Sequence, residues 1–166
     1  MTYVCGFIGT LSYENLNPEL LNQSNKYIEC RGPDSKISKS SQKSKIKYNF
    51  IFNRLSILDL ADNANQPMQH SISGNFLMFN GEIYNHKELR YHLDKEGKSP
   101  AWKGSSDTET ILGCVDAYGL KKTLVKLVGM FSIAIWDKLS KEVILARDRM
   151  GEKPLYYGHN GKLLIF

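Results

Sequence analysis

The sequence predicts an α+β fold in which stacked sheets are flanked by helices. Short apolar and β-branched runs gather toward both ends of the chain, and segments with helical periodicity lie between and among them. The apolar runs contain few alternating polar residues, which is typical of strands covered on both faces. With 166 residues, the chain fits one domain and is long enough to bury a core.

The first half of the chain is expected to contain two strands and one helix. Apolar runs indicate strands at 4–11 and within 48–60, and helical spacing indicates a helix around 20–28 that ends at the breakers of Arg31-Gly32-Pro33-Asp34. Residues 36–47 interleave five lysines with serines, a pattern typical of a solvated, mobile loop. Arg54 stands alone in the apolar run 50–58, and a buried guanidinium needs an anionic partner.

The second half alternates strands with helices. Asn85 is predicted to begin a helix that stops at Gly97, and Ser106 to Glu109 form a capping box in front of a longer helix. A short helix is expected at 121–127. Asn80-Gly81 between apolar segments is the common signature of a two-residue hairpin turn. Strands are expected at 75–79, 130–136, 142–147, 155–158 and 162–166.

Charge and cysteine content exclude several classes of protein. The net charge of +5 rests partly on lysines at 36–47, where no aromatic residue before Tyr48 offers a platform for stacking bases. Cys5, Cys30 and Cys114 lack any C-x-x-C spacing, so neither a metal site nor a disulfide framework is indicated. The odd cysteine count and the missing signal peptide favour a cytoplasmic setting, and no apolar run reaches membrane-spanning length. We therefore expect no nucleic-acid or membrane partner.

Cys5 is the candidate nucleophile. It lies at the start of a predicted strand and is followed by Gly6, which lets another backbone approach closely. A thiol at an amino terminus can use the α-amine as its base, because that amine titrates near pH 8. Four residues, Met1 to Val4, precede Cys5 in this chain.

A set of short motifs resembles the glutamine-hydrolysing domain of asparagine synthetases, a class II glutamine amidotransferase of the N-terminal-nucleophile type. The motifs occur in the family's order across essentially the whole chain. They are Cys5-Gly6, Arg31-Gly32-Pro33-Asp34, Arg54-Leu55-Ser56-Ile57, Gln66-Pro67-Met68, Asn80-Gly81-Glu82-Ile83-Tyr84-Asn85, Ser106-Asp107, Gly129-Met130-Phe131, Ala146-Arg147-Asp148 and Gly151-Glu152-Lys153-Pro154-Leu155-Tyr156-Tyr157.

The resemblance implies a four-layer αββα sandwich and hydrolysis of the glutamine side-chain amide through a cysteinyl thioester. It assigns Cys5 as nucleophile, with Asn80 and Gly81 as oxyanion donors. The substrate-binding residues that it implies are Arg54, Leu55, Ser56, Ile57, Leu58, Asn80, Gly81, Glu82 and Asp107. Arg54 would bind the substrate α-carboxylate, and Glu82 and Asp107 the α-ammonium group. Two of these have simpler readings: Asp107 as a first-turn helix acid, and Arg54 as an ion pair with Asp59 or Asp34.

The resemblance also implies partners beyond this chain. Residues 1–166 would form the N-terminal domain of a longer protein whose synthetase domain is absent here, in cis or in trans. No Ser-Gly-Gly-x-Asp-Ser motif occurs, so ATP and magnesium are expected only in that missing domain, and no cofactor in this one. The ammonia acceptor is aspartate or a related carboxylate, and a dimer is an open expectation.

The sequence departs from the family pattern in three places. Cys30 stands where the family often has histidine, and Lys36–Ile37 interrupt a usual glycine; Cys30 and Cys114 are expected to be inert core thiols. The third departure is the extension before Cys5. Val4 as the true initiator, a short propeptide, and a real extension remain open. The last would leave an impaired amidotransferase-like binding or docking module, which is the alternative function.

Overall fold

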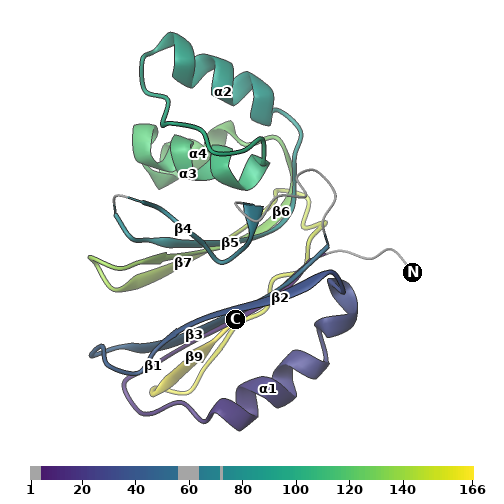
Figure 1. The fold of residues 1–166 in the computed structure, drawn as a ribbon, viewed down its shortest axis with the longest axis vertical. Helices are drawn as coiled ribbons and strands as arrows, with labels where there is room; N and C mark the ends of the chain where they lie inside the picture. Colours follow the sequence, from purple (N-terminus) through teal and green to yellow (C-terminus); the bar gives the residue numbers. More distant parts are fainter. Residues whose placement is uncertain (1–4, 56–63, 72) are drawn as a thin grey trace.

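The structure, a computed structural model, describes residues 5–55, 64–71 and 73–166. Two β-sheets stack face to face, and helices cover the outer face of each (Figure 1). Helices α2, α3 and α4 lie over one sheet, and α1 lies under the other. The order of layers is therefore helix, sheet, sheet, helix, as the resemblance implies.

The first sheet has the strand order β2-β3-β1-β9-β8 within the described residues. Every pairing in it is antiparallel, and β1 lies against β3 with Gly6 opposite Asn53. The bounds are β1 Gly6–Ser12, β2 Ser35–Ser41, β3 Lys47–Arg54, β8 Gly158–His159 and β9 Leu163–Ile165. Phe166 continues this pairing: its N–H and C=O bond to Gly9, and its ring lies where a Cβ on Gly9 would stand.

The second sheet has the order β4-β5-β6-β7 and is also antiparallel. Its central pair is the longest in the molecule's described part, with Phe76 opposite Trp136 and Ile83 opposite Gly129. The strands are β4 Met68–Gln69, β5 Phe76–Ile83, β6 Gly129–Asp137 and β7 Glu142–Arg147.

Helix starts follow the capping signals of the sequence. Asn17 accepts a hydrogen bond from the Glu19 N–H at 2.9 Å and begins α1, and Ser106 accepts one from the Glu109 N–H at 3.2 Å and begins α3. Asn85 begins α2 without a capping bond; its side chain instead bonds to Lys126 O and Val128 N. The helices are α1 Pro18–Lys26, the 3₁₀ turn η1 Glu29–Arg31, α2 His86–Lys95, α3 Asp107–Tyr118 and α4 Leu120–Lys126. No helix in the described ranges is long and apolar enough to cross a membrane.

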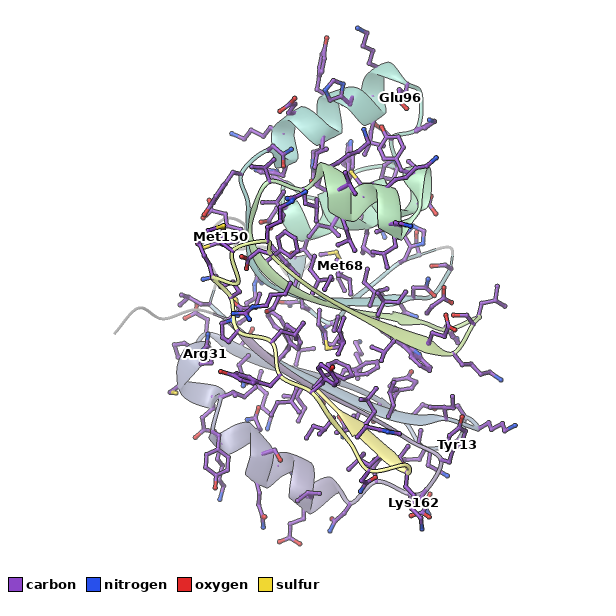
Figure 2. All side chains as sticks on the ribbon, turned by 180° about the vertical axis from the view of Figure 1, so that it is seen from behind. Tyr13, Arg31, Met68, Glu96, Met150 and Lys162 are labelled. Atoms are coloured by element: carbon purple, nitrogen blue, oxygen red, sulfur yellow. The ribbon has the colours of Figure 1, made fainter. Side chains whose placement is uncertain are left out.

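Two apolar cores hold the layers together. Side chains alternate along β5, so Leu77, Phe79 and Ile83 pack against the helices. Phe76 and Met78 point the other way, into the space between the sheets, where they meet Phe50 and Trp136. Side chains fill this space along its length, and Met68 lies in the layer between sheet and helices (Figure 2). The face on which a β5 residue lies thus follows from its odd or even number.

Four predictions about the chain are corrected by the structure. The lysine and serine segment is not simply a loop, because residues 35–41 form the edge strand β2 along β3. Asn80-Gly81 is not a hairpin turn, because β5 runs straight through it. Cys30 is exposed rather than a core thiol, whereas Cys114 is fully buried as expected. The strand expected at 155–158 is only Gly158–His159, and β4 was not predicted.

One carboxylate organises the turn after β7. Asp148 is 6% exposed and accepts hydrogen bonds from the N–H groups of Phe131 at 3.2 Å, Glu152 at 2.9 Å and Lys153 at 3.0 Å. Burial acts to raise the pKa of Asp148, but the hydrogen bonds from these N–H groups have the larger effect. The pKa therefore falls from 3.8 to about 2. Asp148 therefore ties the turn to β6 as a carboxylate.

We predict that Asp148→Asn lowers the free energy of unfolding by about 2 kcal/mol near pH 7, since hydrogen bonds to charged groups contribute about 1.5–3 kcal/mol each. The folded-state pKa lies below the ordinary value, so the contribution is complete above about pH 4 and is lost as the pH falls toward 2. Urea unfolding of both proteins between about pH 7 and pH 3 measures this. A difference that stays constant over that range would contradict the assignment.

Candidate active site

The predicted site residues meet in one pocket at an end of the sandwich. The end is marked by Arg31, whose Nε donates to Cys5 O at 3.3 Å, and it lies opposite the end that carries Tyr13 and Lys162 (Figure 2). The pocket has a volume of about 120 Å³. The predicted residues that line it are Cys5, Arg54, Leu55, Asn80, Gly81, Glu82 and Asp107. Ser56, Ile57 and Leu58 lie outside the described residues.

Cys5 lies directly before β1 and is held against the end of β3. The Leu55 N–H donates to Cys5 Sγ at 3.3 Å, and the thiol faces Leu55 O at 3.5 Å. Burial raises the pKa of Cys5, and the Leu55 N–H and the Arg54 guanidinium only partly offset it. Near neutral pH the thiol is therefore protonated, and its attack on a substrate requires a base.

The register of the second sheet directs the Gly81 N–H into the pocket. Gly81 stands opposite Phe131, but the N–H and C=O of Phe131 both bond to Asp148 on the far side. Gly81 and Phe131 are therefore a non-hydrogen-bonded pair, and the Gly81 N–H points away from β6. Within the described part of the chain, no hydrogen bond from this N–H is found.

Only glycine fits at this position. A Cβ on Gly81 would lie 2.0 Å from Met130 O, and the residue has a φ of +155°. Gly129 on β6 is constrained in the same way, because a Cβ on it would lie 2.1 Å from Glu82 O on β5. The two strands thus approach closely beside the pocket.

Asn80 and Glu82 point into the space between the sheets, because they share the even-numbered face of β5 with Phe76 and Met78. Asn80 is 5% exposed, and no described residue is hydrogen-bonded to its side-chain amide. Its amide can therefore donate to a group in the pocket. The sheet geometry brings this donor and the Gly81 N–H to the same cavity from adjacent residues.

Asp107 has a structural role as well as a place in the pocket. As the first residue of α3, it accepts from the Thr108 N–H at 2.9 Å and from the Ile83 N–H at 3.0 Å. Burial raises its pKa, while the Ile83 N–H and the nearby His86 act to lower it. The Ile83 N–H and His86 thus offset part of the negative charge of Asp107. The carboxylate still lines the pocket, as does Glu82.

Arg54 is buried at the end of β3, with 7% of its surface exposed. Its Nη1 donates to Asn65 Oδ1 at 2.7 Å, and its backbone C=O accepts from the Asp34 N–H at 3.1 Å. The predicted pairing with Asp59 lies outside the described residues. The Arg54 guanidinium acts to lower the pKa of the Cys5 thiol.

Several residues of the pocket carried no predicted role. Gln66 is the most informative of them, because its side chain bonds to both backbone groups of Phe79 beside Asn80. Its motif was recognised but no function was attached to it. The other additions are Ala64, Phe79, Ser106, Thr108, Met130 and Lys153. In the described ranges, no group of three or more acidic, histidine or cysteine side chains is placed to hold a metal.

Comparison with known proteins decides the family. Residues 4–166 match the family model described as "Glutamine amidotransferase domain". The chain belongs to this family. The glutamine amidotransferase domain is 38% identical over 159 residues to asparagine synthetase (glutamine-hydrolyzing) 1 of Bacillus subtilis strain 168, covering 93% of this chain and 24% of that protein. It is 42% identical over 139 residues to asparagine synthetase 2 of the same organism, covering 84% of this chain and 17% of that protein.

The fold has a solved counterpart. Glutamine phosphoribosylpyrophosphate amidotransferase from B. subtilis, complexed with ADP and GMP, superposes with a TM-score of 0.74 at 18% identity, over 96% of this chain and 41% of that one. This likeness confirms the predicted αββα fold of the N-terminal-nucleophile type. The family predicted from the sequence is confirmed as well. The chain spans about a quarter or less of the length of the two curated relatives.

We predict an order of reactivity for the three thiols of this chain. Iodoacetamide near neutral pH should alkylate the exposed Cys30 first, and Cys5 about tenfold more slowly because burial raises its pKa. Cys114, whose pKa burial raises to about 11, should react only after denaturation. Peptide mass spectrometry over time resolves the three rates. Fastest labelling at Cys5 would show a lowered pKa and contradict this order.

Proposed function

We propose that this domain hydrolyses the side-chain amide of L-glutamine to glutamate and ammonia. The observation that carries the proposal is the convergence of a thiol, an arginine, two carboxylates and two oxyanion donors on one pocket in a chain of this family. Cys5 lies directly before β1 and the other residues come from β3, β5 and α3, so their meeting is a property of the fold.

Cys5 would act as the nucleophile. In a chain whose first residue is Cys5, its Sγ would form a bond to the amide carbon, and the thiol proton would pass to the free α-amine of the same residue. That proton would then move to the leaving nitrogen as the C–N bond breaks, giving ammonia and a thioester. Water would attack the thioester through the same amine, release glutamate and restore the thiol. The raised pKa of Cys5 supports the need for such a base.

Asn80 and Gly81 would bind the oxygen that becomes negative during each attack. The amide of Asn80 and the N–H of Gly81 reach the pocket from adjacent residues of one strand. Fixed donors of this kind stabilise the tetrahedral intermediate more than the ground state, and losing one costs about 100- to 1,000-fold in kcat.

Arg54, Glu82 and Asp107 would recognise the amino-acid end of glutamine. A buried guanidinium suits a two-pronged bond to the α-carboxylate, and the two carboxylates suit the α-ammonium group. Leu55, Ser56, Ile57 and Leu58 would frame the same pocket with main-chain groups. Leu55 supports this, since it lines the pocket and bonds to Cys5.

The ammonia would serve an ATP-dependent synthetase domain, in cis or in trans, that amidates aspartate or a related carboxylate in the cytoplasm. The names of the two B. subtilis relatives, and the much greater length of both proteins, support this part of the proposal. ATP and magnesium would belong to that domain.

A matched pair of chains tests the function. We expect a chain whose first residue is Cys5 to hydrolyse glutamine, and the chain that retains Met1 to Val4 to be at least about 100-fold slower, because its Cys5 nitrogen is a peptide nitrogen and cannot act as a base. Glutamate release measures both, intact mass confirms each amino terminus, and Cys5→Ala is the inactive control. A folded chain beginning at Cys5 that releases no glutamate would overturn the proposal and favour a binding or docking module.

A further inference from the structure

The edge of β5 that faces the pocket is not completed by a strand. The neighbouring strand β4 has two residues, which pair with Phe76 and Leu77 only. Odd-numbered residues of β5 direct their backbone groups to this edge, because the even-numbered ones pair with β6. Beyond Leu77, the edge groups of Phe79, Gly81 and Ile83 therefore need other partners within the described part of the chain.

Gln66 takes the place of a strand at Phe79. Its Oε1 accepts from the Phe79 N–H at 2.6 Å, and its Nε2 donates to Phe79 O at 3.1 Å. This pair of bonds is what a paired residue of a neighbouring strand would supply. Nε2 also donates to Thr108 Oγ1 at 3.3 Å, so the same amide ties β5 to the first turn of α3. Gln66 is 6% exposed, and its side-chain amide is held by these three hydrogen bonds.

Asp107 likewise replaces a strand partner at Ile83, because its Oδ2 accepts a hydrogen bond from the Ile83 N–H at 3.0 Å. Gly81 lies midway between the two, about 6.7 Å along the strand from each neighbour of the same face. Two side chains thus complete the edge on either side of one N–H. Among the described residues, the Gly81 N–H lies between these two partnered positions and has no hydrogen-bond partner, so it can donate to an oxyanion.

We propose that Gln66 is a positioning residue for this oxyanion site: it fixes the peptide between Phe79 and Asn80, and through it the Asn80 amide and the Gly81 N–H. The proposal rests on the proposed glutaminase function. Gln66 acts on the donors to the transition state and has no predicted contact with the α-carboxylate or α-ammonium group. Its loss should therefore lower kcat and leave the binding of glutamine nearly unchanged.

Gln66→Met tests this, because methionine keeps the length of the side chain and removes both bonds to Phe79. In a chain beginning at Cys5, we expect kcat to fall about 10- to 100-fold and KM to change less than about threefold. The matched control is Gln69→Met, the same change at an exposed residue of β4 whose amide bonds only to Gly74 O among described groups. The control should keep the reference kcat.

A second measurement separates positioning from general loosening. The thiol of Cys5 would add to the aldehyde carbon of glutamate γ-semialdehyde and give a tetrahedral adduct that needs the oxyanion donors, whereas glutamine binding to Cys5→Ala would not need them. We expect Gln66→Met to weaken aldehyde inhibition by the same factor as kcat, while glutamine affinity in the Cys5→Ala background stays within about threefold. Equal loss of both affinities would overturn the proposal.

Gln66→Glu covers the case in which the methionine variant does not fold. A protonated carboxyl can accept from the Phe79 N–H and donate to Phe79 O, whereas the carboxylate repels that oxygen. The ratio of its kcat to that of the reference chain should therefore rise as the pH falls, since burial raises the pKa of the new carboxyl. A ratio independent of pH, or full kcat in Gln66→Met beside an active reference, would overturn this proposal alone. An inactive reference chain would overturn the proposed function and this inference with it.

Discussion

The antiparallel register between β5 and β6 is the constraint on which the site depends. The N–H and C=O of Phe131 both bond to Asp148, so neither is available to Gly81 on the neighbouring strand. The Gly81 N–H therefore points away from β6, toward the other edge of β5. The same register directs Asn80 and Glu82 into the space between the sheets. A shift of one residue would exchange these two sets and remove both the Asn80 amide and the Gly81 N–H from the pocket. Close approach at Gly81 and Gly129 holds the register in place.

The remaining parts of the site are fixed to this strand pair by buried polar contacts. Arg90 on α2 stacks on Trp102, with 4.1 Å from its Cζ to the ring centroid, and donates to Gly104 O, Ser106 O and Thr110 Oγ1. These bonds fasten the loop that leads into α3, and so place Asp107. On the other sheet, the Asn53 amide bonds to Asn25 at 2.9 Å and joins β3 to α1 near Arg54.

The sequence allowed much of this to be predicted, because the signals were local or belonged to motifs. The capping box at Ser106, the apolar run of β6 and the bounds of β7 follow from side-chain pattern alone. The isolated Arg54 pointed to a buried charge, and it is buried. The family resemblance predicted the four layers. It also predicted a set of site residues, and all of those that the structure describes line one pocket.

The failures have a common physical cause: they depend on partners distant in the chain. Lysines of β2 are tolerated in a strand because it lies at an edge, where their side chains reach solvent. Asn80-Gly81 continues as a strand because β6 pairs along its whole length, which overrides the turn preference. The role of Gln66 could not be read from its motif, since its partner Phe79 lies thirteen residues away, on strand β5. Cys30 is the exception, since it lies in the short turn η1, none of whose residues is buried.

The most direct test of the account is covalent labelling by 6-diazo-5-oxo-L-norleucine, a glutamine analogue that alkylates a thiol positioned against the amide site. In a chain beginning at Cys5, we expect one adduct per molecule, located on Cys5 by tandem mass spectrometry and formed more slowly in excess glutamine. Labelling that is absent from Cys5 in the folded protein, or that falls on Cys30 at a rate unaffected by glutamine, would contradict it.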